Sequence, residues 1–319
     1  MAVEHAADDG AGLEGADRRT SRGGRRSRSR RTTASWPPTL TGRLPAGSTL
    51  YVAHTPNARL ADVAETACAV ERAGFRGCPH VVARRIASRA ELESALARLR
   101  EGGVTRVLLV AGDQTPPAGE FSSTLEILDS GALASAGIES IGVAGHPEGN
   151  PNIPAAALWN ALARKQAYGA QAGANVHIVS QFGFEPAALV AWDRELTSHG
   201  IGLPVHVGVA GPASLKALAK FAMMCGLGAS LGALLSNPTA LGSLKSLVKT
   251  VDEIFPAIVR LRDGALGRRL VQPHFFAFGG VLKTVEWLEA VRAGRFEVDA
   301  GAGALTGQVL NTSMETTGP

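Results

Sequence analysis

The fold of this chain is decided by three apolar runs: VLLVAG at residues 107–112, IESIGVAG at residues 138–145 and NVHIVSQF at residues 175–182. Each run ends in polar or glycine residues, and helical patterns separate the runs. Apolar strands that alternate with helices are typical of a parallel α/β protein. In a (β/α)8 barrel, the carboxyl ends of such strands form the active face.

The same alternation continues on both sides of these runs. Five more stretches have the pattern of strands, and the helical spacing recurs between them. The expected strands are 33–38, 48–54, 75–82, 203–209 and 271–278, and the clearest helices are 60–73, 88–100, 123–136, 154–172, 185–199 and 282–293. Eight strands predict an α/β fold, a single (β/α)8 TIM barrel. The alternative, a doubly wound sheet, would need an early Gly-x-Gly-x-x-Gly turn, and the sequence has none.

Composition suggests three segments: a disordered Arg-rich tail at 1–32, the barrel at 33–300 and a flexible C-terminal tail at 301–319. Eight arginines lie between Arg18 and Arg31. We favour a solvated tail over contact with RNA or acidic surfaces, and over a transit peptide. Residues 1–48 carry nine Arg and five acidic residues, which gives them a net charge of +4. The whole chain, with 32 Lys and Arg against 28 Asp and Glu, also has a net charge of +4. The folded part is therefore neutral, and we expect no nucleic-acid partner for it.

Other sequence features narrow the functional class further. The longest apolar stretch, residues 221–235, is interrupted by glycine and serine, so we expect no membrane span. The three cysteines are unclustered, which favours the reducing cytoplasm and no disulfide framework. No Cys/His spacing resembles a zinc site. The sequence leaves the oligomeric state open, with a homo-oligomer as one alternative.

Polar residues at the strand ends are the candidates for chemistry. Gly112 and Asp113 follow the strand at 107–112, and Asp113 either touches a ligand or forms an ordinary turn. His146, Glu148 and Asn150 lie in a loop that two prolines stiffen. Stiff polar loops on a rigid scaffold are frequent functional sites, although an ordinary turn is the alternative.

A second group of candidates combines an amide with aromatic rings. Gln181 offers both a donor and an acceptor, which match the edge of a heterocycle such as a pterin. Phe182 and Phe184 either stack on such a ring or cap the barrel core. His80 ends a strand, where histidine more often satisfies a hydrogen bond than binds a ligand. Lys165, on the helix at 154–172, either reaches a phosphate or is solvated.

Five segments together resemble the methylenetetrahydrofolate reductase family over roughly residues 49–292. They are CPH at 78–80, LVAGD at 109–113, VAGHPEGNP at 143–151, AGAN at 172–175 with SQF at 180–182, and HFF at 274–276. The segments GPASLK at 211–216 and FAMMCG at 221–226 are similar to those of a divergent bacterial branch. Each motif is modest, but their order and spacing make the series specific.

This resemblance implies a barrel that binds FAD at its carboxyl face. NAD(P)H reduces the flavin, which passes hydride to 5,10-methylenetetrahydrofolate and yields 5-methyltetrahydrofolate in one-carbon and methionine metabolism. By position, Asp113 matches the acid near the flavin and the folate, Gln181 the pterin-binding residue and His80 a flavin contact. Residues 146–150 match the segment along the flavin. The implied partner is a small-molecule folate.

The sequence also departs from the family pattern. The family's first strand carries a Glu before a Pro-Pro pair, and this Glu helps to protonate the folate. The matching stretch at 33–38 has Ala34 there. Family Arg, Tyr and His positions are occupied by Ala111, His146 and Asn150. The family's flavin-site Lys aligns with Gly169, one turn after Lys165. Two alternatives therefore stay open: an inactive folate-binding relative, and a tetrahydrofolate-linked methyl transferase.

Overall fold

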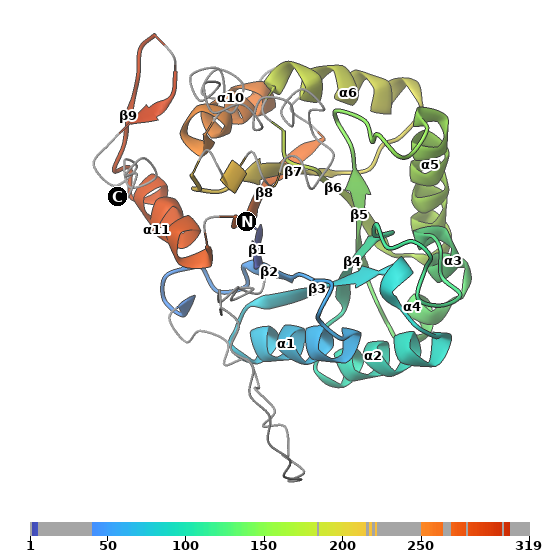
Figure 1. The fold of residues 1–319 in the computed structure, drawn as a ribbon. Helices are drawn as coiled ribbons and strands as arrows, with labels where there is room; N and C mark the ends of the chain where they lie inside the picture. Colours follow the sequence, from blue (N-terminus) through green and yellow to red (C-terminus); the bar gives the residue numbers. More distant parts are fainter. Residues whose placement is uncertain are drawn as a thin grey trace, which may run out of the picture.

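The computed structural model describes the backbone of residues 2–5, together with residues 40–183, 185–214, 217–218, 221, 250–263, 269–278, 280–301 and 303–306. Eight parallel strands close into a barrel, in which each strand pairs with its sequence neighbours and β1 pairs with β8 (Figure 1). The strands are β1 (Ala2–His5), β2 (Thr49–Val52), β3 (Arg76–Val82), β4 (Arg106–Val110), β5 (Ser140–Gly145), β6 (Asn175–Ser180), β7 (Val205–Ala210) and β8 (Leu270–Phe276). The (β/α)8 prediction is confirmed.

Helices surround the barrel and connect the strands (Figure 1). They are α1 (Leu60–Arg72), α2 (Arg89–Glu101), α3 (Thr124–Asp129), α4 (Ala132–Ser135), α5 (Ala155–Ala172), α6 (Pro186–Ser198), α10 (Val251–Asp263) and α11 (Val281–Arg292), and the 3-10 helix η2 (Ala83–Arg85) follows β3. Local signals set their starts. The Ser88 hydroxyl accepts from the Glu91 amide at the start of α2, and a full capping box of Ser123 and Glu126 begins α3.

The first strand is where the structure differs most from the sequence-based expectation. β1 lies at Ala2–His5, inside the segment expected to be a disordered tail. The expected strand at 33–38 lies outside the described residues. β1 closes the barrel between β2 and β8, with Glu4 in register with Tyr51 on one side and Phe276 on the other. Without β1, the edges of β2 and β8 would leave their backbone N–H and C=O groups unpaired. A strand at this place pairs with both edges, which is the physical reason for its position. Four residues are too few to show a strand period.

A second difference concerns the end of the chain. The two-residue strands β9 (Glu297–Val298) and β10 (Leu305–Thr306) form a hairpin. Leu305 is buried in the main core, and the Arg260 guanidinium on α10 donates to the Gly303 carbonyl at 3.2 Å. Residues 303–306 thus pack against the barrel, although the sequence placed them in a flexible tail. Residues 307–319 lie outside the described part.

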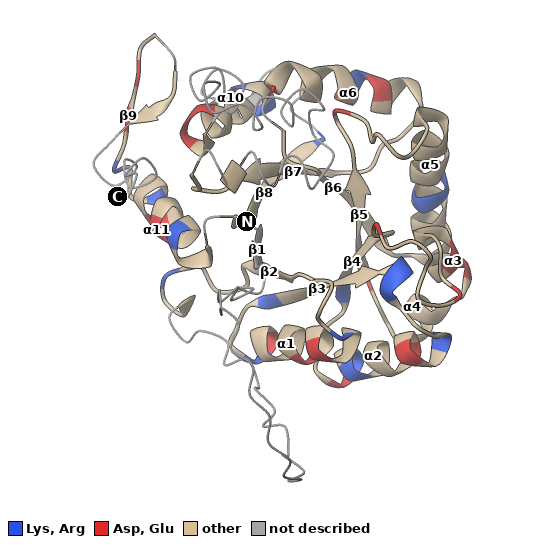
Figure 2. Cartoon of the chain, in the orientation of Figure 1, with Lys and Arg blue, Asp and Glu red and all other residues tan. Residues whose placement is uncertain are grey.

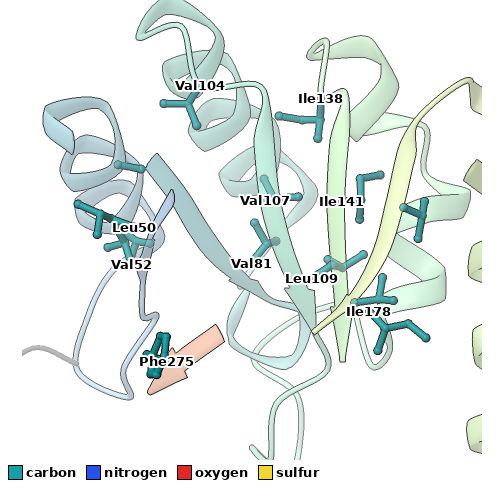
Figure 3. Close-up of a cluster of buried hydrophobic side chains, with 14 of the residues drawn as sticks. Leu50, Val52, Val81, Val104, Val107, Leu109, Ile138, Ile141, Ile178 and Phe275 are labelled. Carbon is teal, nitrogen blue, oxygen red and sulfur yellow. The ribbon is translucent and has the colours of Figure 1, made fainter. Parts of the chain in front are cut away.

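The main hydrophobic core lies between the strands and the helices. One side of the strands β2 to β8 supplies it with residues such as Leu50, Val81, Val107, Ile141 and Ile178 (Figure 3). Charged residues lie mostly on the outer helices and loops, and the strands carry few of them (Figure 2). This pattern explains why the strands read as apolar runs.

Candidate active site at the carboxyl ends of the strands

Most of the candidate residues lie at one face of the barrel, at the carboxyl ends of β3 to β6. We call this face, with the loops that follow the strands, the mouth. Gly112 and Asp113 follow β4, His146 follows β5 and Gln181 follows β6, while His80 lies within β3 near its end. Phe184 lies outside the described residues. The barrel topology therefore brings together residues that are more than 100 positions apart in the sequence.

A glycine turns the chain at the end of β4 and presents Asp113. Gly112 has φ +85°, and an added Cβ would lie 2.4 Å from Cγ1 of Val82 on β3. Both the dihedral angle and the space therefore require glycine. The Asp113 side chain that follows is 89 % exposed, and it faces solvent at the mouth rather than packing into the barrel.

Two consecutive arginines on η2 hold this loop, and the sequence analysis did not single them out. Arg84 donates from Nε to the Ser122 carbonyl at 2.9 Å and from Nη1 to the Thr115 hydroxyl at 3.3 Å. Arg85 donates from Nη2 to Oδ1 of Asp113 at 3.3 Å, and from Nη1 to the His54 carbonyl. No motif marks these arginines. Their only sequence signal is two adjacent cations immediately after an apolar strand.

The buried cation Lys165 and the half-buried, neutral His146 lie close together behind the end of β5. Lys165 lies on the inner face of α5 with 7 % exposure. Burial lowers its pKa to about 8. Burial, and then the positive charge of Lys165, lower the pKa of His146 to about 4. Within the described part of the chain, no carboxylate forms an ion pair with Lys165. A buried ammonium without a counter-ion is costly, so this corner favours an anionic ligand.

The loop after β5 adds polar groups beside a pocket. The Asn150 carbonyl oxygen Oδ1 accepts from the Asn152 amide at 2.9 Å, so Asn150 stiffens its own loop. Glu148 lies against Gly183, where an added Cβ would meet its carboxylate at 2.7 Å. The pocket runs from this loop toward α6 and α10, and its lining comprises Pro147, Glu148, Ser180, Gln181, Gly183, Glu185, Pro186, Ala188, Leu189, Val207, Gly208, Ile254 and Ile258.

Gln181 is held by its backbone and is one of the residues that line the pocket. The backbone amide of Gln181 donates to the Gly145 carbonyl at 2.8 Å. The Ser180 hydroxyl donates to the Gln181 carbonyl at 3.0 Å and accepts from the Gly208 amide at 2.8 Å. These hydrogen bonds connect β5, β6 and β7 near their carboxyl ends. The side chain of Gln181 therefore extends from a rigidly held backbone.

Phe182 has a different role from the substrate contact expected from the sequence. Its side chain is 1 % exposed, and its ring packs at 4.8 Å from Phe278 and 5.7 Å from Phe276. The alternative, that Phe182 caps the barrel core, agrees with this position. The ring has no free face to stack on a ligand, because its neighbours already cover it.

The barrel interior contains a polar layer that sequence reasoning missed. The rings of His177 and His206 stack at 4.1 Å, and the Gln272 amide lies 3.1 Å from Nδ1 of His206. Burial lowers the pKa of His177 to about 4 and that of His206 to about 2. His274 packs edge-on against Tyr51 at 4.4 Å. His177 and His206 are therefore neutral at pH 7. Together with His274, they fill the space that branched apolar residues usually occupy.

Two classes of site receive no support from the described residues. Within the described ranges, no group of three or more His, Cys, Asp or Glu side chains could hold a metal ion. Among the same residues, no helix has the length and apolar character needed to cross a membrane.

Comparison with models of protein families gives a match. Residues 43–236 match the family model described as methylenetetrahydrofolate reductase, which is more than half of the 319-residue chain. The matched region runs from before β2 to beyond β7, and it contains every candidate site residue. It begins after β1. A match of this extent indicates an oxidoreductase of folate metabolism, of a family that generally depends on flavin.

Proposed function

Because this chain belongs to the methylenetetrahydrofolate reductase family, we propose that it reduces 5,10-methylenetetrahydrofolate to 5-methyltetrahydrofolate, with FAD as cofactor and NAD(P)H as electron donor. The reaction balances as a two-electron reduction. NAD(P)H gives up a hydride and becomes NAD(P)⁺, and the folate gains that hydride on its methylene carbon and one proton on nitrogen. Bound FAD supplies the hydride relay between the two substrates.

The observation that carries this proposal is that a carboxylate and an amide both lie at the carboxyl ends of the strands. Asp113 is held by Arg85 at the end of β4, and Gln181 is presented from the end of β6. A fixed amide can bind the donor–acceptor edge of a pterin ring. A nearby carboxylate can stabilise the positive charge that develops when the folate ring opens.

The residues present also fit a flavin. Lys165 is a buried ammonium without a counter-ion among the described residues. His146 lies close enough for this charge to lower its pKa. In our proposal Lys165 binds an electronegative edge or a phosphate of the cofactor, and it replaces the family lysine whose position Gly169 occupies. His80, Glu148 and Asn150 would line the same cofactor. A concave site with few, well-placed polar groups is typical for such a ligand.

The position of β1 favours an active reductase over an inactive relative. The resemblance implies an acid on the first strand, and residues 33–38 offer Ala34 instead. β1 carries Glu4 in register with Tyr51 and Phe276. We propose that Glu4 is the acid that protonates the folate nitrogen. A missing general acid would typically cost about 10²–10⁴-fold in rate.

An absorbance spectrum of the purified protein, before and after anaerobic NADH, tests the proposal. We expect flavin bands that bleach with NADH or NADPH and that return on addition of methylenetetrahydrofolate. Absence of flavin bands, even after FAD is added, would refute the flavoenzyme. Folate binding without NAD(P)H oxidation would support the inactive relative, and methyl transfer to folate from a donor would support the transferase.

A further inference from the structure

Arg85 joins three loops of the mouth through one side chain. It lies on η2, after β3, and its side chain is 16 % exposed. One nitrogen, Nη2, contacts Asp113 after β4, and the other, Nη1, donates to the carbonyl of His54 after β2. A guanidinium keeps its charge at any pH at which proteins fold, and its planar fork has a fixed geometry. The carbonyl bond therefore orients the nitrogen that faces Asp113.

The backbone around Arg85 is fixed as well. The Arg84 amide donates to the Ala111 carbonyl at 2.9 Å, and the Ala118 amide donates to the Arg84 carbonyl at 2.9 Å. The Arg84 side chain binds Ser122 and Thr115 of the same loop. The loop 111–122 is thus attached to η2 on both sides of Asp113. Asp113 itself is attached by its carboxylate, and Arg85 is the described residue that pairs with it.

The two partners of this ion pair have very different exposure. Arg85 is mostly covered by protein, while Asp113 is 89 % exposed. Burial, and then the charge of Arg85, lower the pKa of His54, which favours the neutral form of this histidine. Glu91 on α2 contributes a weaker, opposite effect on His54. Among the described residues, Asp113 is the carboxylate with which Arg85 forms an ion pair.

We propose that Arg85 is a positioning residue that holds the Asp113 carboxylate at the mouth and offsets its negative charge toward a bound flavin. The second half of this inference rests on the proposed function. With Arg85 in place, the mouth presents a neutral pair to the cofactor. Without it, the mouth presents an unpaired carboxylate. A negative charge near the isoalloxazine ring disfavours its reduction, because reduction adds electron density to the ring.

The test compares Arg85→Met and Arg85→Lys with a matched control, Arg72→Met. Arg72 pairs with Glu65 at 3.2 Å near the end of α1, on the side of the barrel away from the mouth. The first measurement is hydrogen exchange of the peptide that covers 111–122, in protein without added cofactor. We expect faster exchange in Arg85→Met, partial restoration in Arg85→Lys and the wild-type rate in Arg72→Met.

The second measurement is the midpoint potential of bound FAD, together with kcat and KM for NAD(P)H. In Arg85→Met we expect a lower potential and a kcat that falls about tenfold, with KM changed less than about twofold, because the pair acts on the reacting ring rather than on nucleotide binding. The double variant Arg85→Met/Asp113→Asn should lose much of the potential shift, since the unpaired carboxylate is gone.

The outcomes separate this inference from the proposed function. If the wild type binds no FAD while loop exchange still rises in Arg85→Met, the positioning role stands and the flavin function fails. If loop exchange and potential both match the wild type in Arg85→Met, the inference is wrong even for a working reductase. Additive effects of Arg85→Met and Asp113→Asn would also overturn it, because they would show that the two residues act independently.

Discussion

At the scale of single residues, the most consequential charge is that of Lys165, which is buried. It has no counter-ion among the described residues. A buried charge destabilises the empty protein and at the same time favours a ligand of opposite charge. Substitution at such a position should therefore change stability and function in opposite directions.

Lys165→Met is predicted to stabilise the cofactor-free protein and to weaken FAD binding. The native pKa of Lys165 is about 8, below that of an unfolded lysine. The unfolded state thus binds more protons between pH 8 and about 10.5, and the cost of burying the charge is largest below pH 8. We expect an unfolding free energy that is higher for Lys165→Met at pH 7 by at most about 3–4 kcal/mol.

The binding half of this prediction is measured by fluorescence titration with FAD. Wild-type affinity should fall as the pH rises through about 8, where Lys165 loses its proton. Lys165→Met should bind more weakly and show no such step. Arg164→Met is the control, because Arg164 is an exposed neighbour that pairs with Asp129. A pH-independent wild-type affinity would contradict the role of Lys165.

Glu4→Gln is predicted to block folate reduction while NAD(P)H still reduces the flavin. A Gln cannot supply the proton, so the rate of the folate half-reaction should fall about 10²–10⁴-fold. Stopped-flow spectroscopy follows the two half-reactions separately. Equal folate rates for Glu4→Gln and wild type would show that another group provides the proton.

At the scale of elements, short connections determine where functional residues lie. The loop after β4 turns at Gly112, and α10 meets α11 through a hydrogen bond from Trp287 Nε1 to Oδ1 of Asp252 at 2.7 Å. Both places combine close packing with polar contacts. Each should respond to a single substitution in a way that depends on the local geometry.

Gly112→Ala is predicted to destabilise the protein by about 2–4 kcal/mol and to displace Asp113, because strain from the positive φ adds to a clash with Val82. Gly103→Ala is the matched control, since Gly103 has φ +74° but nothing within 4 Å of an added Cβ. It should cost only about 1–2 kcal/mol. Urea unfolding measures both variants, and equal costs would show that the contact with Val82 is unimportant.

Asp252→Asn is predicted to stabilise the protein above pH 6 and to have little effect near pH 4. Burial raises the pKa of Asp252 to about 6, although the hydrogen bond from Trp287 acts in the opposite direction. The native state thus holds a proton that the unfolded state loses between pH 4 and 6, so stability falls as the pH rises through that window. Asn can still accept the Trp287 bond. Thermal unfolding at pH 4.5 and pH 8 tests this, with Glu286→Gln on α11 as an exposed control.

At the scale of the whole molecule, the polar interior makes the stability of the barrel depend on pH. His177 is buried and His206 half-buried inside the ring of strands, and both are neutral at pH 7, with pKa values lowered to about 4 and about 2. In the unfolded chain both would titrate near 6.5. The unfolded state therefore binds more protons below pH 6.5, and the contribution of these histidines to stability is lost as the pH falls from 6.5.

We predict that the unfolding free energy drops on the order of 2–3 kcal/mol for each of these histidines between pH 7 and pH 4, before coupling between them is considered. His206→Gln should make the urea midpoint less dependent on pH. His199→Gln, at the exposed end of α6, should follow the wild type. If His206→Gln and wild type lost stability in parallel, the polar layer would not be the acid-sensitive element.

The sequence by itself determined the barrel and most of its strand ends. Seven of the expected strands overlap β2 to β8, because a strand buried on both faces must be apolar for its whole length. The same pattern located Asp113, His146 and Gln181, since polar residues directly after buried strands reach the mouth. The family resemblance also came from the sequence, and the match to residues 43–236 confirms it.

Only the tertiary structure decided which residues close and complete the site. β1 is four residues long, and its place follows from the unpaired edges of β2 and β8, which are 221 positions apart at Thr49 and Leu270. Arg85 meets Asp113 across 28 positions, and Lys165 lies near His146 because α5 folds back on β5. Phe182 turned out to be covered on all sides. Such contacts depend on chain closure and burial, which no local pattern records.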